Sequence, residues 1–252
     1  MINLMVANKQ PNTKYKDDRI ERLIKAQIEN ALEVNWKPEK IIVLANFDIC
    51  HYGIKTYNIE LNGHCLTGSK IYAVDWLLGN DDIKDVIWSH DLDCWQNEWF
   101  EAPEFNDVGI TTYSTKKYNG GCVFWRHTAH DLVQEIKAVI DNGETKEEPT
   151  INKLLKDKSN EDRVTVINNT YNVGCSGFVV RARKADKPIK LAHFNPYNRI
   201  AWETHRLDRN GIGIKSISER LEKLLRKHFD LAYELSEEGK RRQKELMKKY
   251  NP

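Results

Sequence analysis

The first part of the chain alternates between apolar runs and a segment with helical spacing. Ile2–Ala7 is apolar apart from Asn3, and residues 40–46 are apolar from 41 to 45, as is typical of strands buried on both faces. Between them, residues 17–34 carry apolar side chains at positions 20, 23, 24, 28, 31 and 32, the spacing of one helix face. A helical crossover of this length joins parallel strands, so the chain is predicted to begin as a β–α–β unit.

The alternation continues less regularly through the rest of the chain. Further helices are predicted at 67–78, 128–140, with Thr128 as its N-cap, and 149–155, with Pro149 at its first position. Strands are predicted at 84–90, 109–113, 121–126, 163–168 and 177–183, and a short strand or a loop at 190–194. The pattern indicates an α/β fold with a mixed central sheet flanked by helices over residues 1–210. Helices at 212–231 and 236–250 are predicted to form a basic appendage over residues 211–252.

The composition excludes several classes of protein. The chain has 252 residues, of which 40% are hydrophobic and 10% aromatic, so it can bury a sizeable core and is not disordered throughout. No stretch approaches the roughly 18 apolar residues of a membrane span. The N-terminus lacks the basic region of a signal peptide. Five cysteines without a CxxC pair favour a reducing, cytoplasmic location over a disulfide framework or a zinc ribbon.

Positive charge is concentrated near the C-terminus. Residues 215–249 hold eleven Lys/Arg and seven Asp/Glu, a net of +4, whereas the whole chain has a net charge of +2. A solvated face of an amphipathic helix accounts for this distribution. Attraction to a polyanion such as nucleic acid is the functional alternative, and it would be confined to this segment.

A pair of aspartates follows the apolar run at 84–90. Ligands of open α/β sheets bind beyond the carboxyl ends of strands. If the chain stays extended, Asp91 and Asp93 point the same way and direct two carboxylates at one point. Such hard oxygen donors suit Mg²⁺ or Mn²⁺ together with a phosphate. The structural alternative is a polar turn in which Asp91 caps a backbone amide.

Three later segments add to this pair in chain order. They are Tyr118-Asn119-Gly120-Gly121 with the apolar residues after it, the acidic helix start Glu147-Glu148-Pro149, and Leu191-Ala192-His193-Phe194-Asn195-Pro196. Together with Asp91-Leu92-Asp93, they resemble the motifs of nucleotide-sugar-dependent glycosyltransferases of GT-A fold. The resemblance covers roughly residues 1–205 and implies a Rossmann-type, GT-A-like catalytic domain.

The resemblance also implies roles for individual residues. Asp93 is a direct ligand of Mn²⁺ or Mg²⁺, Asp91 binds the metal or the donor ribose, and His193 is the third metal ligand. A buried, hydrogen-bonded histidine is the structural alternative for His193. The acceptor hydroxyl requires a carboxylate, for which Glu148 is the first choice and Glu147 the second; both could instead serve the helix dipole.

Other segments are candidates for binding the donor. Asn119, Gly120 and Gly121 would bring backbone close to the donor sugar, unless they form a turn or bulge. The base is expected near Ala7, Asn8 and Asp48, with Phe47 lining the recess, although strand-end turns would look the same. Further candidates are Lys9, Lys14 and Lys16 for a phosphate, and Arg199 and Trp202 for the donor or the acceptor, Trp202 being equally suited to the core.

The sequence therefore predicts a metal-dependent glycosyltransferase that takes a sugar from a nucleotide-diphosphate sugar, UDP-linked by preference, to an acceptor hydroxyl. The sequence leaves the acceptor open among a glycan, a lipid-linked acceptor and hydroxylated bases in DNA held by the basic tail. Relatives carry Asp-Gln or Asp-Asp where this chain has Glu147-Glu148, and Gly where it has Asn195-Pro196. The alternatives are a nucleotidyltransferase acting on a sugar phosphate, for which no Gly-rich basic loop follows the first strand, and a non-catalytic nucleic-acid-binding protein.

Overall fold

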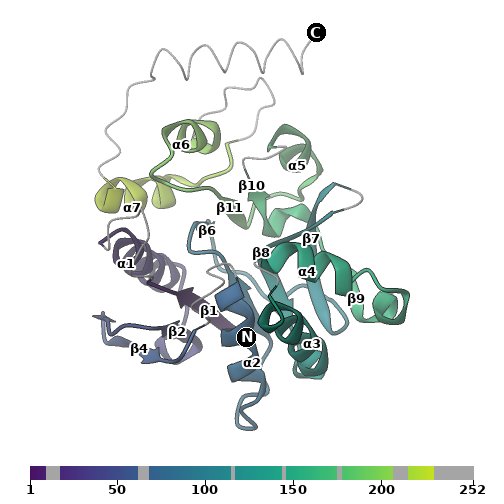
Figure 1. Cartoon of the computed structure of the whole chain (residues 1–252). Helices are drawn as coiled ribbons and strands as arrows, with labels where there is room; N and C mark the ends of the chain where they lie inside the picture. The colour runs from purple at the N-terminus through teal and green to yellow at the C-terminus, as the bar shows by residue number, and fades with distance from the viewer. Residues whose placement is uncertain are drawn as a thin grey trace. The chain divides into compact units, whose positions relative to one another are not determined.

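The computed structural model describes residues 1–9, 18–61, 68–114, 117–143, 146–174, 178–206 and 215–229 (Figure 1). The chain divides into two compact units. The first comprises residues 1–92 and 100–167, and the second comprises residues 93–99 and 168–252. The boundary predicted at residue 210 stays a prediction, because residues 207–214 lie outside the described part.

A mixed sheet organises the first unit. Within the described ranges it has eight strands in the order β3-β4-β2-β1-β5-β8-β7-β9. Their bounds are β1 Ile2–Ala7, β2 Ile41–Ala45, β3 Cys50–His51, β4 Ile54–Asn58, β5 Ile87–His90, β7 Val108–Ser114, β8 Lys117–Trp125 and β9 Val164–Val166. The central strand β1 is parallel to β2 and β5, whereas β8 is antiparallel to β5 and β7. The predicted mixed sheet and its initial β–α–β unit are confirmed.

Apolar side chains from the sheet and from three helices form the main core of this unit. The helices of the unit are α1 Asp18–Glu33, α2 Ser69–Leu78, α3 His130–Asp141 and α4 Glu147–Leu154. Leu4 and Val123 of the sheet pack with Leu77 of α2, Ile136 of α3 and Ile151 of α4. This packing fixes the start of α2 and the start of α4 relative to the strand ends. Thr128 is not the N-cap that was predicted, because a 3₁₀ turn at His127–Ala129 precedes α3.

A smaller sheet organises the second unit. Its described strands are β6 Cys94–Gln96, β10 Val173–Gly174 and β11 Leu191–His193, in the order β10-β11-β6. The helices are α5 Phe178–Lys184, α6 Arg199–Arg206 and α7 Glu219–Phe229. Trp95 of β6 stacks edge-on against Phe229 of α7, and its indole N–H donates to the carbonyl of Phe194.

The second unit departs most from the sequence prediction. Residues 178–184 form a helix and not a strand, because Phe178 and Ala182, one helical turn apart, pack with Val173 and Ile189. The helix predicted at 212–231 begins only at Glu219, and α6 was not predicted. The basic tail at 236–250 lies outside the described residues.

In the ranges that the structure describes, each helix is too short or too polar to cross a bilayer.

Candidate functional site

The carboxyl ends of β1, β2 and β5 meet at the point where the strand order of the first unit reverses. The amide nitrogen of Asn8 donates to the hydroxyl of Ser69 at 2.7 Å, and Asn46 donates to the amide oxygen of Asn8 at 3.0 Å. Asn46 also accepts from the Lys9 backbone N–H at 2.8 Å. These contacts join the ends of two parallel strands to the first turn of α2. A topological switch point of this kind is where α/β sheets bind ligands.

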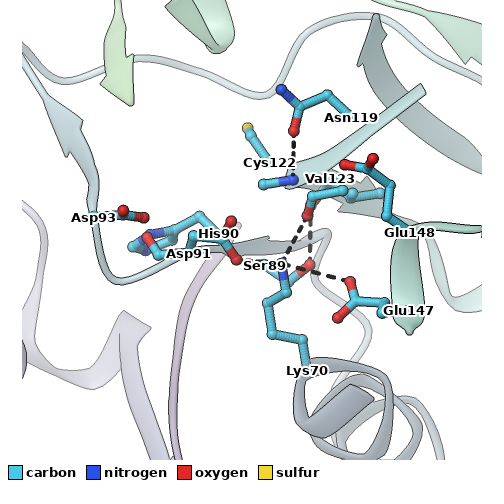
Figure 2. A network of polar contacts seen from close by, with 12 residues as sticks. Lys70, Ser89, His90, Asp91, Asp93, Asn119, Cys122, Val123, Glu147 and Glu148 are labelled. Atoms are coloured by element: carbon cyan, nitrogen blue, oxygen red, sulfur yellow. Dashed lines mark hydrogen bonds and ion pairs between the residues drawn. The ribbon is translucent and has the colours of Figure 1, made fainter. Parts of the chain in front are cut away.

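Lys70 is the centre of a partly buried polar network beside this strand end (Figure 2). Its ammonium group lies 2.5 Å from Asp91 Oδ1 and donates to the carbonyl of Gly120 at 2.7 Å. It also lies 3.5 Å from Glu147 Oε1. One cation therefore joins the end of β5, the glycine pair of β8 and the first turn of α4.

Burial and charge act against each other in this network. Burial alone would lower the pKa of Lys70, but the charges of Asp91 and Glu147 outweigh it and raise that pKa. Burial raises the pKa of Glu147 to about 7, with the nearby charge of Asp91 adding to the rise and Lys70 opposing it. Glu147 is thus poised to exchange a proton near neutral pH, a property that acid–base groups of enzymes need.

The raised pKa of Glu147 predicts a specific effect of pH on stability. The folded chain holds the Glu147 proton more tightly than the unfolded chain does. The contribution of this proton to the unfolding free energy is therefore complete below pH 4.5 and is lost as pH rises through about 7. Glu147→Gln mimics the protonated form at every pH. We expect the variant to match the wild type at pH 4.5 and to exceed its unfolding free energy by about 3 kcal/mol at pH 8. Urea denaturation at both pH values measures this, and a difference independent of pH would contradict it.

Glu148 occupies a different environment from its neighbour. Its carboxylate accepts from the hydroxyl of Tyr113 at 3.0 Å and pairs with the ammonium group of Lys117 at 2.9 Å. Its side chain is 27% exposed, whereas that of Glu147 is 6% exposed. The two glutamates that the sequence left as alternatives are therefore distinguished by burial: only Glu147 faces Lys70.

The segment Asn119-Gly120-Gly121 lies in β8 next to the aspartate end of β5. The amide oxygen of Asn119 accepts from the N–H of Gly121, and the carbonyl of Gly121 accepts from the N–H of Asp91. A Cβ atom at Gly120 would lie 3.4 Å from Glu147 Oε1, so the missing side chain leaves this carboxylate next to backbone. Asn119 is 1% exposed, and its Nδ2 has no partner among the described residues.

Asp93 and His193 face each other in the second unit. Antiparallel pairing sets His193 of β11 opposite Cys94 of β6, and the N–H of Phe194 donates to the carbonyl of Asp93 at 2.9 Å. His193 Nε2 lies 3.2 Å from Asp93 Oδ1, although the residues are 100 positions apart. On its other side, His193 Nδ1 lies 3.0 Å from the amide oxygen of Asn172. A nitrogen and a carboxylate oxygen at this separation suit a shared cation.

Asp91 is tied to this pair through the chain itself. Leu92 alone separates Asp91 from Asp93, so their Cα atoms are at most about 7 Å apart. The prediction that Asp91 and Asp93 point the same way along an extended segment was wrong, because residues 92–93 form a turn. His90, the residue before Asp91, is buried and bonds to the carbonyl of Asp91 and to Asn3.

The remaining sequence candidates have mixed surroundings. Ala7 is buried beneath the strand end, and Asp48 is exposed. The ammonium group of Lys9 lies over the ring of Phe47 and pairs with Glu21, whereas Lys14 and Lys16 lie outside the described residues. Trp202 is fully buried and packs against Phe194, so it belongs to the core. Arg199 pairs with Glu203 on the next turn of α6.

Two residues of these networks escaped the sequence analysis. Lys70 is one of many lysines in the chain, and nothing in its neighbours marks it. Asn172 lies in a run rich in asparagine that reads as a turn. No feature of the sequence distinguishes Lys70 or Asn172 from an exposed polar residue. Their contacts become visible only in the folded structure, where strand pairing and the helix starts place them.

Several solved structures with a similar fold are glycosyltransferases. The chain is similar to a glycosyltransferase involved in glycosylation of the major capsid of PBCV-1, with a TM-score of 0.51 and 12% identity over 77% of this chain and 93% of that chain. It is similar to the galactosyltransferase LgtC, solved with donor and acceptor sugar analogues, with a TM-score of 0.51 and 13% identity over 95% of this chain and 99% of that chain.

A third similar structure is the glycosyltransferase GlyE of Streptococcus pneumoniae TIGR4, with a TM-score of 0.51 and 13% identity over 91% of this chain and 63% of that chain. At such identities the likeness establishes the fold alone. The chain thus has the GT-A fold of glycosyltransferases, as predicted. The sequence matches no protein-family model and no curated protein.

Proposed function

We propose that the chain is a metal-dependent glycosyltransferase that moves a sugar from a nucleoside-diphosphate sugar, UDP-linked by preference, to an acceptor hydroxyl. The observation that carries the proposal is the contact between Asp93 and His193, which brings a carboxylate and an imidazole together across 100 positions. The GT-A fold supports the reaction class, but one fold hosts many functions, so the assignment depends on the residues of the site.

The proposed metal ligands are Asp91, Asp93 and His193. Two carboxylates and one imidazole form a donor set that suits Mn²⁺, and less well Mg²⁺, which prefers oxygen alone. When bound, such an ion stabilises the negative charge that develops on the departing diphosphate. Asp91 retains the alternative role of binding the donor ribose, since Lys70 already neutralises one of its oxygens.

The proposed donor site extends along the strand ends of the first unit. Ala7, Asn8 and Asp48 are assigned to the nucleoside, because they lie at or just beyond the ends of β1 and β2. Asn119, Gly120 and Gly121 are assigned to the donor sugar. Asn119 fits this assignment, because a buried amide N–H₂ without a partner is costly unless a ligand oxygen accepts from it.

Glu147 is the proposed acid–base group, in place of Glu148, the first choice from the sequence. Glu147 is buried beside Gly120, and its pKa lies near neutral pH, so it can accept or return a proton. Lys70 orients it and balances its charge once the proton has left. Glu148 is already held by Tyr113 and Lys117, and it is the second candidate.

Turnover tests this proposal directly. The purified chain is incubated with Mn²⁺ and a panel of nucleoside-diphosphate sugars, and donor hydrolysis or transfer is followed. We expect hydrolysis of one donor class, loss of activity with EDTA, and recovery with Mn²⁺. Glycans and duplex DNA with hydroxymethylated pyrimidines serve as acceptors. Pyrophosphate release from a nucleoside triphosphate and a sugar phosphate would instead indicate a nucleotidyltransferase. Activity unaffected by EDTA would contradict the metal assignment.

A further inference from the structure

We propose that Asn172 is a positioning residue for the metal centre: it selects the ring tautomer of His193 whose proton is on Nδ1 and whose lone pair is on Nε2. The inference rests on the proposed function, because it concerns one of the assigned metal ligands. It adds a residue that touches no metal, donor or acceptor, and acts only through His193.

The two nitrogens of the His193 ring face two different oxygens. Nδ1 lies 3.0 Å from Asn172 Oδ1, and Nε2 lies 3.2 Å from Asp93 Oδ1. Both oxygens can only accept a hydrogen bond, so a neutral ring can donate to one of them and not to both. With the proton on Nδ1, facing Asn172, the lone pair is on Nε2, the atom beside the carboxylate with which it would share a cation.

The backbone that carries this amide is buried and held in place. Asn172 is fully buried, and the guanidinium of Arg181 donates to its main-chain carbonyl. Two residues later, a Cβ atom at Gly174 would lie 2.8 Å from Nη1 of Arg181, so glycine leaves the room that the guanidinium occupies. Gly174 of β10 is also the parallel partner of His193 in β11. The backbone that carries Asn172 and the strand that carries His193 are therefore joined.

The selection matters because Asp93 favours the opposite tautomer. A carboxylate is a stronger acceptor than an amide oxygen, so without Asn172 a proton on Nε2 would bond to Asp93. That proton would occupy the direction in which a metal ion binds, and it would have to leave first. Groups that orient a metal-bound histidine in this way are typically worth a factor of 10–100 in metal affinity.

Two substitutions of matched size separate this role from a structural one. Asn172→Leu removes the acceptor, and Asn172→Asp keeps one. The probe is Mn²⁺ alone, titrated into the full chain and followed by electron paramagnetic resonance. We expect N172L to bind Mn²⁺ about 10–100-fold more weakly and N172D to bind at least as tightly as the wild type. A merely structural role would weaken both variants, and thermal unfolding reports whether each is folded.

The tautomer is measured separately by NMR of the metal-free chain with ¹⁵N-labelled histidine, in which the His193 signal is the one that His193→Ala removes. We expect the Nδ1–H form in the wild type and the Nε2–H form in N172L. A wild-type ring with its proton on Nε2 overturns the inference, even if N172L fails to fold. Asp93→Asn and His193→Ala are titrated in parallel. If both bind Mn²⁺ as the wild type does, the metal site of the proposed function fails; if both lose affinity while N172L keeps it, only the role of Asn172 fails.

Discussion

Asp93→Asn is expected to reduce sugar transfer by about 10³-fold, because several kcal/mol of leaving-group stabilisation depend on the metal ion that Asp93 would hold. The substitution keeps the size of the side chain and removes its charge. It also replaces one oxygen of the contact with His193, which is the contact that carries the functional assignment. The loss should therefore appear both in Mn²⁺ affinity and in turnover, with partial recovery at high Mn²⁺ concentration.

The matched control is Asp81→Asn, the same change at a carboxylate whose side chain is 98% exposed and pairs only loosely with Lys84. It should leave transfer and Mn²⁺ binding unchanged. Initial rates at a series of Mn²⁺ concentrations distinguish weaker binding from slower chemistry. Equal activity of the Asp81 and Asp93 variants would remove Asp93 from the metal site, and with it the main support for the reaction class.

The first unit could largely be predicted from the sequence because its central strands have a clear apolar pattern. Ile2–Ala7 is apolar apart from Asn3 and Ile41–Ala45 is continuously apolar, as is typical of strands covered on both faces, and α1 shows a regular helical face. The hairpin formed by β3 and β4 was missed because its strands lie at the sheet edge and mix polar with apolar residues.

The second unit could not be predicted in the same way. The adjacent β-branched residues Val179 and Val180 favour a strand by local preference, yet packing of Phe178 and Ala182 in one apolar cluster forms a helix. The strands β6, β10 and β11 have three residues or fewer, which is too short for a periodicity to develop. Their pairing nevertheless determines what Asp93 and His193 contact.

Only those residues of the candidate site that lie in recognisable motifs could be predicted from the sequence. From its own residues, His193 was better explained as a buried, hydrogen-bonded histidine. The hydrogen bond is present, since Asn172 bonds to it, but the side chain is only partly buried. Its role as a ligand entered through the resemblance. Spacing along the chain cannot indicate that Lys70 joins Asp91 to Glu147, because that network depends on where α2 and α4 begin against the sheet.

Glu147→Gln should have the second largest effect on catalysis, a fall in transfer of about 10²–10³-fold, which is the usual contribution of an acid–base group. The neighbouring Glu148→Gln is the matched control, with the same chemistry one position along the same helix. It breaks a partly exposed pair with Lys117 and a bond from Tyr113, so we expect less than about a tenfold change.

The pH profile of the reaction tests whether Glu147 acts through its raised pKa, in addition to testing whether Glu147 is needed. If the ionised Glu147 accepts the proton, the wild-type kcat/KM rises with pH through about 7, and the rise is absent in the Glu147→Gln variant. Single-turnover rates at saturating donor exclude a simple loss of binding. If Glu148→Gln causes the larger loss of activity, Glu148 is the acid–base group, as the sequence analysis preferred. Glu147, buried beside Lys70, would then only help to position Asp91. Because the two glutamates are adjacent in the chain, a difference between Glu147→Gln and Glu148→Gln reports the burial and the pKa of the carboxyl groups and not their position along the chain.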